Sequence, residues 1–165
     1  KASWGTDTAA NKAQMTHLLD AHESKAERAP SNLRKHFDLI RKTVGMASLK
    51  DTAEHLLALP TEGDEWLATA VDTFRRGSPT SAALAWELQH RCRHRSLADV
   101  FRIEYNVAIS CCAAHDFAEG VRALLIDKDR SPKWDPPTLA AVEQKFIESH
   151  FRDHHDGAHP LSDWR

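Results

Sequence analysis

The chain has 165 residues, of which 41% are hydrophobic, which is enough for one domain with a modest core. Its net charge of −2, with histidine counted as neutral, shows no whole-chain preference for a polyanion such as nucleic acid. No apolar run reaches the length of a membrane span and no signal peptide is visible, so we expect no membrane partner.

Apolar residues at helical spacing predict an all-α chain with short connections and no strand. Ser31, Ser48 and Ser96 are the expected N-caps of three helices. The expected helices cover roughly residues 10–27, 31–45, 48–59, 62–77, 80–92, 96–112, 116–130 and 137–151. We divide the chain into an N-terminal helix and linker (1–30), a helical region (31–151) and a His-rich tail (152–165).

The most informative segment is HDFAEGVRALLIDKDRSPKWD, residues 115–135. Asp116 and Glu119 have the spacing of a capping box and predict that a helix begins there, with one buried apolar face. Gly120 lowers helix propensity, so we expect it to serve close packing. The helix should stop before Pro132 and deliver a charged end and Trp134 to a surface.

The run DFAEGVRALLIDKDRSPKW resembles the C-terminal signature of 3-hydroxyisobutyryl-CoA hydrolases and their relatives in the crotonase (enoyl-CoA hydratase/isomerase) superfamily. The segments SPTS (78–81) and LADVFRIEY (97–105) agree with it, and LRKHF (33–37) agrees more weakly. The resemblance spans roughly residues 30–151 and implies the helical C-terminal region of a crotonase-fold α/β spiral.

This resemblance implies hydrolysis of 3-hydroxyisobutyryl-CoA, a step of valine catabolism. The family's oxyanion donors and acidic catalytic residues belong to an N-terminal half that nothing here matches, so we expect no catalytic residue in this chain. The expected partners are an acyl-CoA substrate and that N-terminal core, in the same chain or a separate one. No metal or redox cofactor is implied, and coenzyme A is part of the substrate. The expected location is the mitochondrial matrix in a eukaryote and the cytoplasm in a bacterium.

Lys128, Lys133 and Trp134 are the candidate coenzyme A contacts. Coenzyme A presents an adenine ring and several phosphates, which favour an aromatic or apolar platform flanked by cations. In enoyl-CoA hydratases an aromatic residue and a lysine of the corresponding stretch contact that end of the ligand. Trp134 matches the aromatic position, and Lys128 and Lys133 both remain candidates for the lysine. The alternative is that Trp134 is a core anchor that seals the signature helix.

Glu104 shares a predicted apolar helix face with Leu97, Phe101 and Ala108. A buried carboxylate needs a partner, so Glu104 is either a catalytic acid or base or, as we favour, half of an ion pair with Arg122.

Three other clusters have plain interpretations. The basic run 90–95 is either a set of cations at a helix C-terminus, which we favour, or a phosphate contact. The tail histidines 150, 154, 155 and 159 indicate a frayed, solvated end and not a metal site. Cys92, Cys111 and Cys112 indicate reduced core thiols of an intracellular protein.

Two alternative functions remain open. A non-catalytic homologue can be a structural protein of a mitochondrial ribosome, the one setting in which we expect nucleic acid, contacted through Arg91 to Arg95. A crotonase homologue can also hydrate an enoyl-CoA, because this part of the chain does not report the reaction type.

Overall fold

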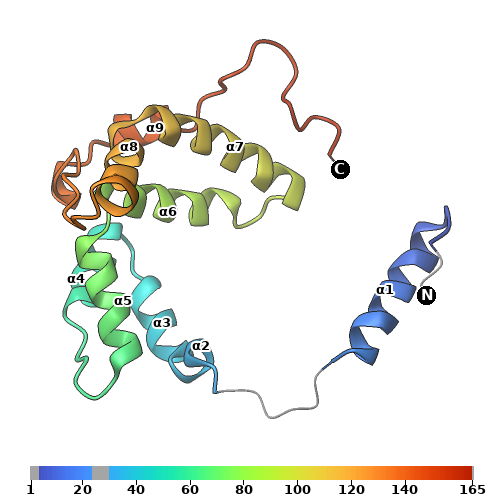
Figure 1. The fold of residues 1–165 in the computed structure, drawn as a ribbon, viewed down its shortest axis with the longest axis horizontal. Helices are drawn as coiled ribbons and strands as arrows, with labels where there is room; N and C mark the ends of the chain where they lie inside the picture. The colour runs from blue at the N-terminus through green and yellow to red at the C-terminus, as the bar shows by residue number, and fades with distance from the viewer. Residues whose placement is uncertain (1–3, 24–29, 165) are drawn as a thin grey trace. The chain divides into compact units, whose positions relative to one another are not determined.

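The computed structural model describes residues 4–23 and 30–164, and these residues form helices and loops without any strand. The chain divides into two units, residues 1–37 and 38–165 (Figure 1). The all-α prediction is therefore confirmed for the described residues. None of the helices among these residues is long and apolar enough to cross a membrane.

The first unit contains α1 (Thr8–Ala21) and α2 (Asn32–Lys35). Asp7 caps α1 by accepting the backbone N–H groups of Ala9 and Ala10 at 2.8 and 3.2 Å. No residue of α1 is buried. The helix expected over residues 10–27 ends at Ala21, and its last expected residues, 24–27, lie outside the described part of the chain.

The single helix expected over residues 31–45 is wrong, because the chain forms α2 and then α3 (Phe37–Val44). His36 separates them with a φ of −100° and a ψ of 11°, outside the helical region, and its side chain is buried. Ser31 caps α2 as predicted, since its hydroxyl accepts the Arg34 N–H.

The second unit contains two helix pairs, α4 (Leu49–Leu57) with α5 (Glu65–Arg76), and α6 (Pro79–Cys92) with α7 (Leu97–Ala113) (Figure 1). Side-chain oxygens cap all four helices at their N-termini, from Ser48, Asp64, Ser78 and Ser96. The predictions for Ser48 and Ser96 are confirmed. The core lies between α6, α7 and α9 (Gln144–Ser149), where Leu84, Val107 and Ile147 pack together.

The last expected helix, residues 137–151, is mostly absent. Only the short 3-10 turn η2 (Leu139–Ala141) and α9 form, because Thr138 and Val142 have extended backbone angles. Ile147 holds α9 in place, with 1% of its surface exposed.

The His-rich tail is not a frayed end over residues 153–164. Asn106 donates to Asp153 at 2.8 Å, and Arg102 donates to the Leu161 carbonyl at 3.1 Å. The Tyr105 and His159 rings meet edge to face with centroids 5.2 Å apart. The tail therefore lies along α7. Backbone carbonyls make part of this contact, and the spacing of side chains in the sequence does not reveal such contacts.

Candidate functional site

The signature segment forms α8 (His115–Val121), which continues into one π-helical turn, η1 (Arg122–Ile126). The expected capping box is wrong, because the helix begins at His115 and Asp116 lies inside its first turn. The Asp116 carboxylate instead accepts the Ser78 hydroxyl at 2.5 Å and the Asp135 N–H at 2.9 Å. Asp116 thus ties α8 both to the start of α6 and to the segment that follows Trp134.

Glu119 and Arg122 form the centre of an ionic cluster. The Arg122 guanidinium donates to both Glu119 oxygens at 2.8 Å, and its Nη1 donates to Asp127 and Asp129 at 2.6 and 2.7 Å. The Lys133 N–H also donates to Glu119, at 2.6 Å. Hydrogen bonds from Arg122 and then from the Lys133 N–H lower the pKa of Glu119 to about 2. Hydrogen bonds to Glu119, Asp129 and Asp127 raise the pKa of Arg122, so Glu119 and Arg122 are both ionised at neutral pH.

This cluster fixes the loop of residues 127–133 in an unusual conformation. Lys128 and Arg130 have φ angles of 57° and 54°, in the left-handed region that non-glycine residues seldom adopt. The Arg130 N–H donates to the Ala123 carbonyl at 3.0 Å, and the Ser131 N–H donates to Asp129 at 2.8 Å. Such backbone angles persist where surrounding contacts over-determine them, so the loop displays its cations on a fixed frame.

Trp134 anchors the end of this frame. Its indole N–H donates to the Arg76 carbonyl at 2.9 Å, and its ring lies against Gly120. A Cβ added at Gly120 would approach the ring carbon Cη2 to 3.4 Å. A Cβ at this distance would be in ordinary van der Waals contact, so the Trp134 ring packs against Gly120 but leaves room for a methyl group there. Trp134 is half-buried between the end of α5 and α8.

An open pocket of about 630 Å³ lies beside Trp134. Its walls are mainly apolar and come from the end of α5, the start of α6, the end of α7, α8 and η1, with Phe117, Leu124 and Leu125 among them. Phe117, Leu124 and Leu125 belong to the apolar face that was predicted to be buried, but they are 53, 61 and 63% exposed, so this prediction is wrong for the described residues. Ile126 is 68% exposed as well.

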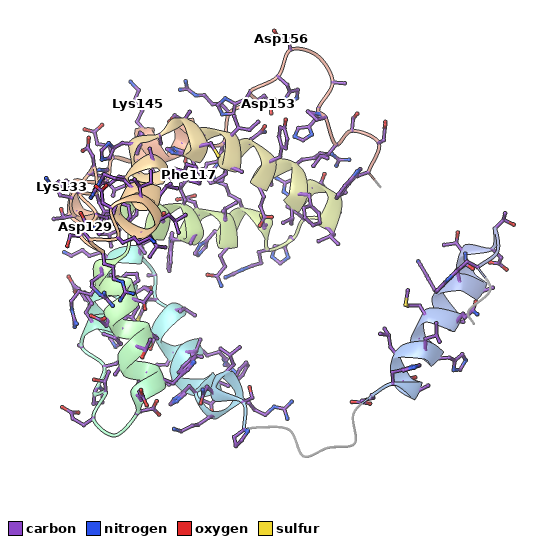
Figure 2. All side chains as sticks on the ribbon, viewed as in Figure 1. Phe117, Asp129, Lys133, Lys145, Asp153 and Asp156 are labelled. Atoms are coloured by element: carbon purple, nitrogen blue, oxygen red, sulfur yellow. The ribbon has the colours of Figure 1, made fainter. Side chains whose placement is uncertain are left out.

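The structure separates the three predicted coenzyme A contacts. Trp134 lines the pocket, whereas Lys128 and Lys133 do not and have exposed side chains on the loop beside it. Figure 2 shows Lys133, Asp129 and Phe117 at the same end of the α6–α7 pair. Arg130 lines the pocket and was not among the predicted contacts. Its place in the run DKDRSPKW was visible in the sequence, but the sequence does not tell which cation of the run lines the pocket.

The prediction for Glu104 is wrong. Its side chain is exposed and has no ion pair within residues 4–23 and 30–164, and Arg122 is engaged by Glu119, Asp127 and Asp129. The buried residues of α7 are Ala98, Asn106 and Val107, while Leu97 is 72% exposed. α7 carries apolar residues on two sides. Helical spacing predicted that the side with Leu97 is buried, but that side is exposed.

The basic run is divided in its roles. Arg91 pairs with Glu148 of α9, donates to Glu87 at 3.2 Å and lies 3.9 Å from the centre of the Phe151 ring. Arg91 therefore joins α6 to α9. Arg93, His94 and Arg95 are exposed.

The three cysteines are free thiols, but the prediction that all lie in the core is wrong for Cys112, which is exposed. Burial raises the pKa of the half-buried Cys92 and Cys111 thiols. In the described part of the chain, no three His, Cys, Asp or Glu side chains gather as metal ligands.

Comparison with known sequences gives a consistent family. The family model for enoyl-CoA hydratase/isomerase matches residues 3–151. The mitochondrial 3-hydroxyisobutyryl-CoA hydrolase of Danio rerio is 34% identical over 140 residues, which cover 83% of this chain and 36% of the relative. That of Homo sapiens is 33% identical over 131 residues, which cover 79% and 33%.

Two solved structures share the fold of this region. A carnitinyl-CoA dehydratase from Mycobacterium thermoresistibile superposes with a TM-score of 0.68 at 28% identity, over 88% of this chain and 40% of that one. An enoyl-CoA hydratase from Rhodobacter sphaeroides gives a TM-score of 0.65 at 26% identity, over 87% and 42%. The chain spans about a third of the length of these curated relatives. It belongs to the enoyl-CoA hydratase/isomerase family and forms a helical portion of the crotonase fold.

Proposed function

We propose that the chain is the C-terminal part of an acyl-CoA thioester hydrolase that converts 3-hydroxyisobutyryl-CoA to 3-hydroxyisobutyrate and coenzyme A. The observation that carries this proposal is the loop of residues 127–133, called the signature loop below, whose cations stand on a fixed ionic frame beside Trp134 and an apolar pocket. The names of the relatives support the choice of substrate, and also a mitochondrial location if the source is a eukaryote.

In this proposal the chain holds the coenzyme end of the substrate. Lys128 and Lys133 attract its phosphates and Trp134 supplies an aromatic surface, as such a ligand requires. The loop needs no reordering to present these groups, because Arg122 and Glu119 already fix it. A prearranged site loses less conformational freedom when the ligand binds.

The chemical step is assigned to the rest of the family fold. Water attacks the thioester carbonyl carbon, the carbonyl oxygen gains negative charge, and the sulfur leaves as a thiol once protonated. Hydrogen-bond donors aimed at that oxygen and a carboxylate that assists the attack lower the barrier. We assign neither role to a residue of this chain.

The proposed partner is that remaining part of the fold, whether joined to this chain or separate. Leu124, Leu125 and Ile126 form a contiguous exposed apolar run on η1. Exposed apolar patches of this kind mark interaction surfaces. Covering them would also give the pocket a closed wall.

A hydratase is the second candidate, because the two superposed structures are a carnitinyl-CoA dehydratase and an enoyl-CoA hydratase. A structural role in a ribosome is less well supported, since Arg91 of the basic run already pairs within the chain.

The test is an assay of the complete polypeptide that contains these 165 residues. We expect thiol release from 3-hydroxyisobutyryl-CoA and no hydration of an enoyl-CoA. Hydration without thiol release would replace the hydrolase by the hydratase, and inactivity toward both, with normal folding, would favour a structural role. The 165 residues alone should release no thiol above a buffer blank.

A further inference from the structure

Residues 153–164 lie along α7 and beyond residues 3–151, which the family model matches. Arg102 of α7 donates to three backbone carbonyls of this tail, and the Phe101 and Trp164 rings meet edge to face with centroids 5.2 Å apart. The family assignment accounts for neither the tail nor its contacts with α7, so they need an explanation of their own.

His159 holds the last turn of the tail in a way that requires a neutral ring. The Leu161 N–H donates to His159 Nδ1 at 3.0 Å, so Nδ1 carries no proton and Nε2 carries the one proton of the ring. The Nε2 atom is buried and has no hydrogen-bond partner in the described part of the chain. Protonation of Nδ1 would set two N–H groups against each other and break the bond to Leu161.

The groups of α7 next to His159 offer it no negative charge. The Tyr105 ring meets the His159 ring edge to face, and Arg102 donates to a backbone carbonyl of the same turn at 3.1 Å. Asp99 already pairs with Arg102 at 2.8 Å, and Glu104 is exposed without an ion pair among the described residues. A proton on His159 would therefore place a second cation beside Arg102.

The tail itself adds no compensating charge. The His155 and His159 rings meet edge to face with centroids 4.7 Å apart, so two protonated rings would repel each other. Asp153 accepts a hydrogen bond from α7, Asp163 is exposed, and Figure 2 shows Asp156 at the outer bend of the tail. Within residues 4–23 and 30–164, none of these carboxylates pairs with a histidine of the tail.

We propose that residues 153–164 form a pH-sensitive strap, which stays on α7 while His159 is neutral and leaves it when His159 is protonated. The attached tail excludes this proton and the released tail accepts it, so a fall in pH below about 6.5, where a free histidine titrates, favours release. One excluded proton shifts the equilibrium about tenfold per pH unit. Release uncovers the Phe101 and Tyr105 rings, which follow Leu97 at helical spacing, and so extends the exposed apolar side of α7.

His154 offers a matched control, because its contact with α7 tolerates a proton. Its Nε2 lies 2.6 Å from the Ser110 hydroxyl oxygen, and Ser110 gives its own proton to the His150 carbonyl at 3.2 Å. The His154 Nε2–H is therefore the donor to Ser110, and it remains a donor in both charge states of the ring.

The experiment follows the 165-residue chain by NMR from about pH 8 to about pH 5, the range in which histidine changes charge. Heteronuclear NOEs report the mobility of the tail amides, and the ring nitrogen shifts of His159 report its proton. We expect a rigid tail at pH 8 and release in step with proton uptake, with about a tenfold fall in the attached fraction relative to the released fraction per pH unit.

Two variants separate the sensor from the other histidines. His159→Asn keeps an acceptor near the position of Nδ1 and cannot take up a proton, so its tail should stay attached at pH 5. His154→Gln also removes a tail histidine but keeps a donor for Ser110, so it should release its tail over the same pH range as the unaltered chain.

Several results would overturn the strap. One is proton uptake by His159 while the tail stays rigid, and another is a tail that is already mobile at pH 8. Release of the His159→Asn tail with an unchanged pH dependence would remove His159 as the sensor. If that variant never attached its tail, the ring nitrogen shifts of the unaltered chain would decide. The amide signals of residues 38–151 should persist at pH 5, and their loss together with the tail would mean general unfolding and count against a strap.

Discussion

The signature loop and the side of α7 that carries Leu97 and Glu104 differ in whether their side chains have partners among the described residues. In the loop, Arg122 is shared by three carboxylates and Trp134 has both a hydrogen-bond partner and a packing partner. On α7, Leu97, Phe101 and Glu104 are exposed to solvent. The contacts that hold the loop lie among the described residues. This side of α7 has the apolar composition of a buried face, but the described residues leave it exposed. The two regions should therefore respond very differently to substitution.

The largest effect is expected from Trp134→Ala. It removes a half-buried ring and its hydrogen bond to Arg76, which should lower the free energy of unfolding by about 3 kcal/mol. Urea unfolding measures the change. Trp164→Ala is the matched control, because Trp164 is also aromatic but exposed in the tail. Equal effects of the two substitutions would mean that Trp134 is not an anchor.

Gly120→Val should have the next largest effect. The added branches meet the Trp134 ring, and such overpacking should cost about 1–3 kcal/mol of stability. Gly120→Ala adds only a Cβ at ordinary contact distance and gains helix propensity, so it should be neutral or stabilising. A valine variant as stable as the alanine variant would contradict the close contact. Thermal melting of the two variants gives the comparison.

The ionic cluster predicts a dependence of stability on pH. The pKa of Glu119 is lowered to about 2, so its contribution is complete above the unfolded value of 4.5 and is lost as the pH falls toward 2. Arg122→Gln removes the main cause of the shift and should reduce the loss of melting temperature between pH 5 and pH 2. Parallel melting curves for the variant and the unaltered chain over this range would contradict the role of the cluster.

The smallest effect is expected from Glu104→Gln. The exposed carboxylate has no ion pair in the described residues, so the free energy of unfolding should change by no more than about 0.5 kcal/mol. Urea unfolding tests this directly. A loss above about 2 kcal/mol would show that Glu104 is buried and paired after all.

The sequence predicts the parts of the fold that depend on local chemistry. Ser31, Ser48 and Ser96 cap helices as expected, because a cap involves only the next three residues. Asp116 has the same local spacing, yet it binds Ser78 and Asp135 across the fold, so its partners were not visible in the sequence. Periodicity failed on α7, since it ranks faces by composition and cannot tell which face this chain covers.

The candidate site was partly predictable for the same reason. Trp134 was singled out by its residue type and the family signature, and it lines the pocket. Arg130 required the structure, because Lys128 and Arg130 both have left-handed backbone angles and only Arg130 lines the pocket.

The central claim is that the signature loop holds the coenzyme end of an acyl-CoA substrate, and steady-state kinetics of the complete polypeptide tests it most directly. Lys128 and Lys133 are both changed to alanine, and thermal melting confirms folding. We predict a raised KM for 3-hydroxyisobutyryl-CoA with little change in kcat, because the phosphate end keeps the same contacts in the ground and transition states. The rise should shrink with added salt, as expected for exposed lysines. An unchanged KM in a normally folded double variant would contradict the claim and leave the loop as structural packing.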